Sequence, residues 1–173
     1  MADILSREQR SALMSKVRSS DTKPEWILRC ALHRLGFRYI LKNKRLPGNP
    51  DLVFPRYRTV VFVHGCFWHR HVGCKDASMP KSNESFWANK FSENVQRDAK
   101  AVEALSQEGW KVLIVWECEL MKKTIETVEK VARAIRSNVH TLSPVEYREL
   151  DLERKDLLTA AEEKVRYRID KET

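Results

Sequence analysis

Apolar residues recur at helical spacing in several stretches of the chain. Residues 6–17 show this spacing, and Ser6 with Gln9 resembles a capping box, so a helix is expected there. A second start signature, Thr22 with Glu25, predicts a helix that ends at Gly36. Its apolar stripe consists of Trp26, Ile27, Cys30, Ala31 and Leu35. Further helices are expected over residues 83–107 and 124–136, with a short one beginning at Ser143.

Strands are predicted between these helices. Residues 37–41 alternate between apolar and polar, and residues 51–54 follow a turn rich in Pro, Gly and Asn, so two short strands are expected. Residues 59–63 are continuously apolar and β-branched, which is typical of a central strand covered on both faces. Residues 110–116 predict another buried strand. The element order indicates an α/β fold, a mixed sheet flanked by helices.

The length of 173 residues suits a single core. We expect one domain over residues 1–140 and a highly charged extension, helical or mobile, over 141–173. No apolar run approaches the roughly 18 residues that a membrane span needs. The first residues lack the order of a signal peptide, so an intracellular protein is expected.

The net charge of +8 is unevenly distributed. Up to and including Lys75 there are 15 basic and 5 acidic residues, whereas 17 basic and 19 acidic residues follow. A positive excess confined to one half favours a polyanionic partner, most commonly nucleic acid.

Cysteine and histidine are concentrated between residues 66 and 74, on a predicted loop after a strand. Cys118 follows the 110–116 strand, so neighbouring strands would bring it beside this loop. The resulting tetrahedral set would be a closed, structural zinc site formed by Cys66, His71, Cys74 and Cys118. His69 would then be free for chemistry, although spacing alone also allows His69 to be the ligand and His71 to be free. The alternative is that these cysteines are small buried side chains, as we expect for Cys30.

Asp51, His64 and His69 are expected at one end of adjacent strands. A Pro-Asp turn followed by a strand with a catalytic residue can hold Mg²⁺ against a scissile phosphate. By the residues alone, Asp98 suits a solvated helix acid and Glu25 a capping-box partner of Thr22.

The aromatic residues Phe67 and Trp68 lie within the Cys/His loop, where no core is evident. Together with Trp87 they suit a wedge that enters a base stack. Phe86 is expected to pack inward. Core positions are expected for Trp26, Trp110 and Trp116.

Four blocks together resemble the very short patch repair mismatch endonucleases of bacteria. They are Leu-Pro-Gly-Asn-Pro-Asp at 46–51, Val-Phe-Val-His-Gly-Cys-Phe-Trp-His at 61–69, Asn-Val-Gln-Arg-Asp at 94–98 and Gly-Trp-Lys-Val-Leu-Ile-Val-Trp-Glu-Cys at 109–118. The blocks occur in the family's order, and the resemblance covers residues 7–136.

The resemblance implies a restriction-endonuclease-like fold of the PD-(D/E)xK superfamily, in which Phe62-Val63-His64 replaces the usual Glu-x-Lys. It implies nicking on the 5′ side of the mismatched thymine at T:G mispairs, which arise by deamination of 5-methylcytosine. Mg²⁺ would bind Asp51 and the main-chain carbonyl of Val63. The other implied catalytic residues are His69 as general base, Asp98, which would orient His69 or hold metal-bound water, and Glu25 and His64 as supports of the metal–water network.

The resemblance also implies that Phe67, Trp68 and Trp87 wedge into the mismatch from the major groove and that Met14, on a DNA-contacting N-terminal helix, enters from the minor groove. The implied partner is double-stranded DNA, with mismatch-repair proteins as further partners. The protein is implied to be a monomer in the bacterial cytoplasm, associated with the nucleoid. A rival hypothesis is a zinc-stabilised module that binds distorted duplex without cutting it. Another is a hydrolase with an open zinc site that acts on small substrates.

Overall fold

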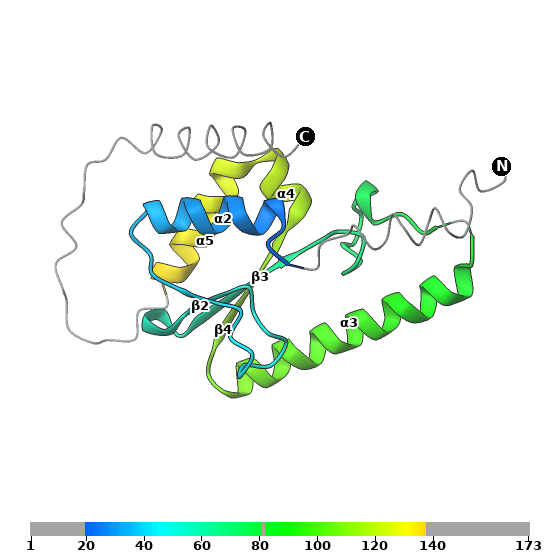
Figure 1. Cartoon of the computed structure of the whole chain (residues 1–173), viewed down its shortest axis with the longest axis horizontal. Coiled ribbons are helices and arrows are strands. Elements are labelled where there is room, and N and C mark those ends of the chain that lie inside the picture. Colours follow the sequence, from blue (N-terminus) through cyan, green and yellow to red (C-terminus); the bar gives the residue numbers. More distant parts are fainter. Residues whose placement is uncertain (1–19, 81, 138–173) are drawn as a thin grey trace.

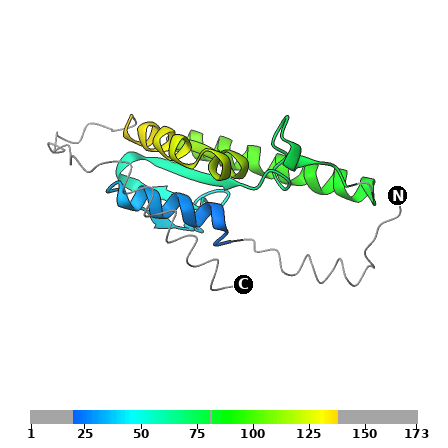
Figure 2. The same ribbon diagram turned by 90° about the horizontal axis from the view of Figure 1, so that it is seen from above.

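The computed structural model describes residues 20–80 and 82–137, and in this part of the chain a four-stranded mixed sheet lies between helices (Figures 1 and 2). The strands are β1 (Ile40–Leu41), β2 (Leu52–Phe54), β3 (Thr59–His64) and β4 (Lys111–Trp116), in this order across the sheet. β2 pairs antiparallel with both β1 and β3, whereas β3 and β4 are parallel. The predicted α/β class is confirmed.

Helices cover both faces of the sheet (Figure 1). One face carries α2 (Lys23–Arg34), α4 (Glu117–Lys122) and α5 (Thr124–Arg136), and the other carries the last part of α3 (Glu84–Gln107). Short 3₁₀ turns, η1 (Pro55–Tyr57) and η2 (Lys75–Ala77), connect other elements. Thr22 caps α2 through the predicted capping box with Glu25.

Alternating side chains of the central strands supply two cores, because successive residues point to opposite faces. Val61 belongs to the core under α2, α4 and α5, while Val60 and Phe62 pack against Leu105 of α3. The prediction that β3 is covered on both faces is therefore confirmed.

Three details differ from the sequence-based expectation. β4 is not a buried strand: Val115 is buried, but Ile114 is 42% exposed, because β4 lies at an edge of the sheet. The strand expected over residues 37–41 is reduced to β1. Helix α4 was not predicted, since its six residues are too few to show a clear apolar period.

The first turns of α3 extend past the sheet, toward the segment that follows β3 (Figure 1). Among the described residues no helix has the length and apolar character needed to cross a membrane. The helices expected at 6–17 and from Ser143 lie outside the described residues, as does Met14.

Candidate functional site

The predicted site residues gather at the carboxyl ends of β3 and β4. These strands are neighbours, which was the condition for Cys118 to reach the loop, and His64 at the end of β3 pairs with Trp116 at the end of β4. The loop of residues 65–74 leaves the end of β3, and α4 with Cys118 leaves the end of β4. Parallel pairing therefore joins segments about 50 residues apart into one site.

A Cys/His cluster forms from four side chains: Cys66, His71, Cys74 and Cys118. Their ligand atoms all lie within 4.8 Å of one another. The Nδ1 atom of His71 is 3.6 Å from Cys66 Sγ and 3.3 Å from Cys118 Sγ. Three sulfur donors and one imidazole suit a tetrahedral zinc ion with no open coordination position.

The loop around this cluster turns tightly. The His71 amide donates to the Cys66 carbonyl at 3.1 Å, and the Cys74 amide donates to the His71 carbonyl at 3.2 Å. Cys66 is 1% exposed, and burial raises the pKa of its thiol to about 12. Burial also raises the pKa of Cys118. A metal ion bound here would displace the thiol protons, so metal binding and loop folding would be coupled.

A second cluster consists of His64, His69 and Asp98, whose ligand atoms also lie within 4.8 Å of one another. His69 Nδ1 forms a short hydrogen bond with Asp98 Oδ2, although the two residues belong to the loop and to α3. The imidazole rings of His64 and His69 stack with centroids 3.8 Å apart and an interplanar angle of 10°. Burial, and next the nearby His69, lower the pKa of His64 to about 4, so its imidazole is neutral at pH 7.

These two clusters distinguish the histidines that spacing alone could not. His71 lies among the thiols, while His69 faces Asp98. The side chains of His69 and Asp98 are 22% and 19% exposed, so a substrate in solution can reach them.

Asp51 directly precedes β2, at the same end of the sheet as this second cluster. The Val63 amide, one residue before His64, donates to Asp51 Oδ2 at 2.7 Å. Burial raises the pKa of Asp51 to about 6, and the carboxylate of Glu25 raises it further, while the Val63 hydrogen bond opposes the rise. A partly buried carboxylate next to a second carboxylate is stabilised by a cation, and oxygen donors suit Mg²⁺.

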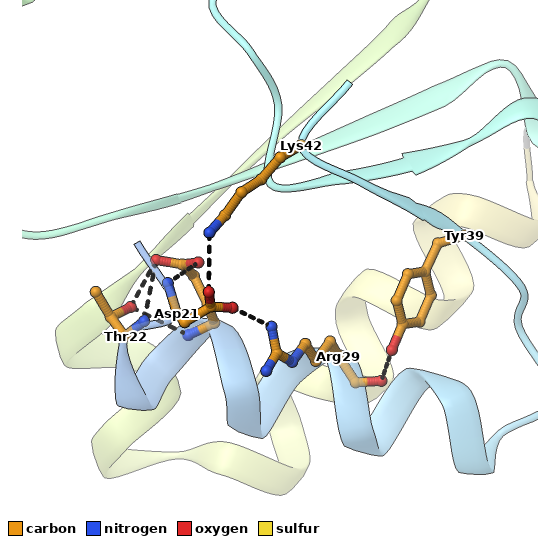
Figure 3. A network of polar contacts seen from close by, with 6 residues as sticks. Asp21, Thr22, Arg29, Tyr39 and Lys42 are labelled. Carbon is orange, nitrogen blue, oxygen red and sulfur yellow. Dashed lines mark hydrogen bonds and ion pairs between the residues drawn. The ribbon is translucent and has the colours of Figure 1, made fainter. Parts of the chain in front are cut away.

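Glu25 is 7% exposed and occupied by local hydrogen bonds. It accepts from the Thr22 hydroxyl at 2.8 Å and from the Asp21 amide at 3.0 Å, so the capping role expected from sequence is confirmed. Figure 3 shows the adjoining network, in which Asp21 binds Arg29 at 2.5 Å and Lys42 at 3.1 Å. Sequence reasoning missed this network because Asp21 and Lys42 are 21 positions apart and no periodic pattern relates them.

The aromatic residues of the loop and α3 form one group. Phe67 contacts Trp68 and Trp87 edge to face, with centroids at 5.1 and 5.5 Å, and all three side chains are partly exposed. Buried Phe91 lies against Phe67, and the Asn94 amide group donates to the Trp68 carbonyl at 3.1 Å. The group is thus anchored to α3 and remains accessible.

Two aromatic predictions were wrong. Phe86 is 53% exposed rather than packed inward, because it precedes the part of α3 that meets the sheet. Trp116 does not join an apolar core: its ring stacks on His71 and contacts His64 by its edge. Trp26 and Trp110 are partly buried against the two cores, as expected.

Comparison with known proteins adds a family match. The family model for the DNA mismatch endonuclease Vsr matches residues 2–75. The type II nicking enzyme V.XorIIP of Xanthomonas oryzae pv. oryzae is 51% identical over 120 residues, 69% of this chain and 88% of that protein. The type II nicking enzyme V.NmeAIP of Neisseria meningitidis is 45% identical over 141 residues, 80% of this chain and all of that protein. DNA mismatch endonuclease Vsr of Escherichia coli is 41% identical over 120 residues, 69% of this chain and 76% of that protein.

Proposed function

Because this chain belongs to the family of the DNA mismatch endonuclease Vsr, we propose that it nicks duplex DNA at T:G mismatches, on the 5′ side of the mismatched thymine. One observation carries the chemistry of this proposal. His69 is paired with Asp98, and it stacks on His64 one residue from the amide that holds Asp51. The proposed base and the proposed cation ligand are therefore at the same end of the sheet, which supports a shared site.

His69 is the proposed general base. When its Nδ1–H donates to Asp98, Nε2 is left as the acceptor for a proton from the attacking water. Asp98 also stabilises the imidazolium that this transfer creates, and it holds the ring in one orientation. The neutral imidazole of His64 packs on His69 without adding a second positive charge.

Asp51 is the proposed direct ligand of Mg²⁺, with the main-chain carbonyl of Val63 as a second ligand and Glu25 and His64 as supports of its hydration. Bound Mg²⁺ would supply positive charge to the oxygens of the scissile phosphate. The partly buried position of Asp51 and its raised pKa support this role, because a cation relieves the cost of the ionised carboxylate.

A structural zinc ion is proposed to bind Cys66, His71, Cys74 and Cys118. Its role is to hold the loop that presents both His69 and the aromatic group.

The proposed fold family is the PD-(D/E)xK superfamily. Phe67, Trp68 and Trp87 are proposed to wedge beside the mispair from the major groove, with Met14 opposite. Unstacking costs a few kcal/mol and least at a mispair, which favours mismatched sites.

The test is a panel of labelled duplexes, one for each mismatch plus a T:A control, incubated with Mg²⁺ and zinc-loaded protein. The proposal predicts a single nick in the thymine strand of the T:G duplex and none in the control. Asp51→Ala should abolish nicking while the Kd for DNA changes little. A protein that binds mismatched duplex at saturation yet leaves it intact would instead be the non-cleaving DNA-binding module.

A further inference from the structure

One indole ring lies between the two histidine clusters. Trp116 ends β4 directly opposite His64, so both side chains lie on the same face of neighbouring parallel strands. Its ring stacks on His71, with centroids 4.1 Å apart and an interplanar angle of 4°. It also meets His64 at 5.5 Å and 71°, an edge-to-face contact.

These contacts continue to the proposed general base. His64 stacks on His69, and His69 is hydrogen-bonded to Asp98 on α3. On the other side, His71 lies against the thiols of Cys66 and Cys118. An unbroken series of packed side chains therefore connects the Cys/His cluster with the His69–Asp98 pair.

We propose that Trp116 is a positioning residue through which the Cys/His cluster sets the orientation of His69. His69 and His71 both belong to a loop without regular secondary structure, so side-chain contacts rather than a strand or helix must orient their rings. The strands fix the backbone of Trp116 and His64 at the sheet end, while their side chains can still turn, so that the ring contacts transmit the position of His71 to His69. A shift of His71 when the cluster loses its metal would therefore displace the base. The activity readout of this inference rests on the proposed function.

Trp116→Leu removes the ring between the clusters and keeps an apolar side chain. We expect a roughly 10- to 100-fold lower single-turnover nicking rate at saturating T:G duplex, because a misplacement near 1 Å can cost about 100-fold. The Kd for DNA and the zinc content should stay close to those of the unsubstituted protein. Trp116→Phe keeps an aromatic face against His71 and should recover most of the rate.

Trp110→Leu is the matched control. Trp110 directly precedes β4, at the opposite end of that strand from Trp116, and packs against the core under α3. Its loss should lower stability and leave the nicking rate within a few-fold of the original. A general effect of removing a tryptophan from this part of the fold is thereby separated from a specific effect on His69.

NMR of the zinc-loaded protein without DNA gives a readout independent of activity. Because His71 stacks on the indole face, its ring protons should be shifted upfield. Nuclear Overhauser effects should be observed from the Trp116 indole to both His71 and His64. Trp116→Leu should abolish the upfield shift and also move the signals of His69, whose ring stacks on His64. Trp110→Leu should move none of them.

Two results would overturn the inference: a zinc-loaded Trp116→Leu protein that nicks at the original rate, or unchanged His64 and His69 signals in that variant. If Trp116→Leu does not fold, two other results would overturn the inference. One is that the unsubstituted protein shows no Overhauser contacts between Trp116 and the two histidines. The other is that Trp116→Phe nicks as slowly as His69→Gln. If the unsubstituted protein nicks no mismatch, the proposed function fails, and the NMR comparison still decides the coupling.

Discussion

Replacing Asp51 by asparagine should stabilise the magnesium-free protein while it abolishes nicking. The carboxylate of Asp51 has its pKa raised from the ordinary value of 3.8 to about 6, chiefly by burial and then by Glu25. At neutral pH the ionised carboxylate therefore destabilises the fold in the absence of a cation. Asparagine removes the charge and keeps an oxygen that accepts from the Val63 amide.

The magnitude follows from the two pKa values. Each pKa unit corresponds to about 1.4 kcal/mol, so the change from 3.8 to about 6 represents about 3 kcal/mol at pH 7. That value already includes the hydrogen bond from Val63, but asparagine also brings two N–H donors into a partly buried site, which offsets about 1 kcal/mol of the gain. The expected net stabilisation by Asp51→Asn is about 2 kcal/mol, or a Tm higher by about 4–8 °C for a chain of this length.

The pH dependence supplies the discriminating assay. Below pH 3.8 the carboxyl is protonated in both the folded and unfolded states, and no penalty exists. As the pH rises toward about 6, the unfolded state loses its proton first, so the penalty grows and then becomes constant. Urea unfolding of both proteins from pH 4 to 8, with zinc and without Mg²⁺, should show a difference that increases up to about pH 6. Added Mg²⁺ should stabilise only the unsubstituted protein.

The reasoning fails if Asp51→Asn is the less stable protein at pH 7.5, or if the difference between the two proteins does not shrink toward pH 4. In either case the carboxylate would be satisfied by surrounding groups and would not need a cation. Effects of the Cys/His cluster cancel in this comparison, since both proteins contain the same cluster.

Three further predictions follow from the site. His69→Gln should lower the single-turnover nicking rate by about 10²- to 10⁴-fold and Asp98→Asn by a smaller factor, since Asp98 acts only through His69; equal rates for His69→Gln and the unsubstituted protein would contradict the base assignment. Cys118→Ser should lower bound zinc and the free energy of unfolding, because the cluster loses one of its donors. Cys30→Ser, outside the cluster, is its control in metal analysis and urea unfolding, and equal zinc in both variants would exclude Cys118 as a ligand. Thr22→Ala should cost about 1 kcal/mol in urea unfolding, since it removes the N-cap of α2; an unchanged midpoint would show that Glu25 alone satisfies the helix start.

Local patterns were predicted well where a few neighbouring residues decide the outcome. The capping box of α2 involves residues three apart, and α3 ends where Gly109 takes a positive φ of 78°. The run of residues 59–63 likewise became a strand buried on both faces, because its β-branched side chains need packing on each side.

The candidate site was predictable only in part. The density of cysteine and histidine between residues 66 and 74 indicated a metal loop, and Cys118 was expected nearby on the assumption that its strand neighbours β3. Spacing could not decide between His69 and His71, since both lie on one irregular loop. The contact of His69 with Asp98 and that of His71 with Cys118 distinguish them, and each spans a long distance in sequence.

The sequence by itself determined most of the helices and strands of the described region, the uneven distribution of charge along the chain and the kinds of donor available, because these depend on composition and short-range order. Only the tertiary structure decided that β4 is an edge strand, that Asp21 binds Lys42, and that the Trp116 ring lies between two histidines rather than in a core. Ring stacking and ion pairing require side chains within a few ångströms of one another. The parallel pairing of β3 with β4 and the docking of the loop on α3 bring such groups together, and no local pattern specifies which distant residues will meet.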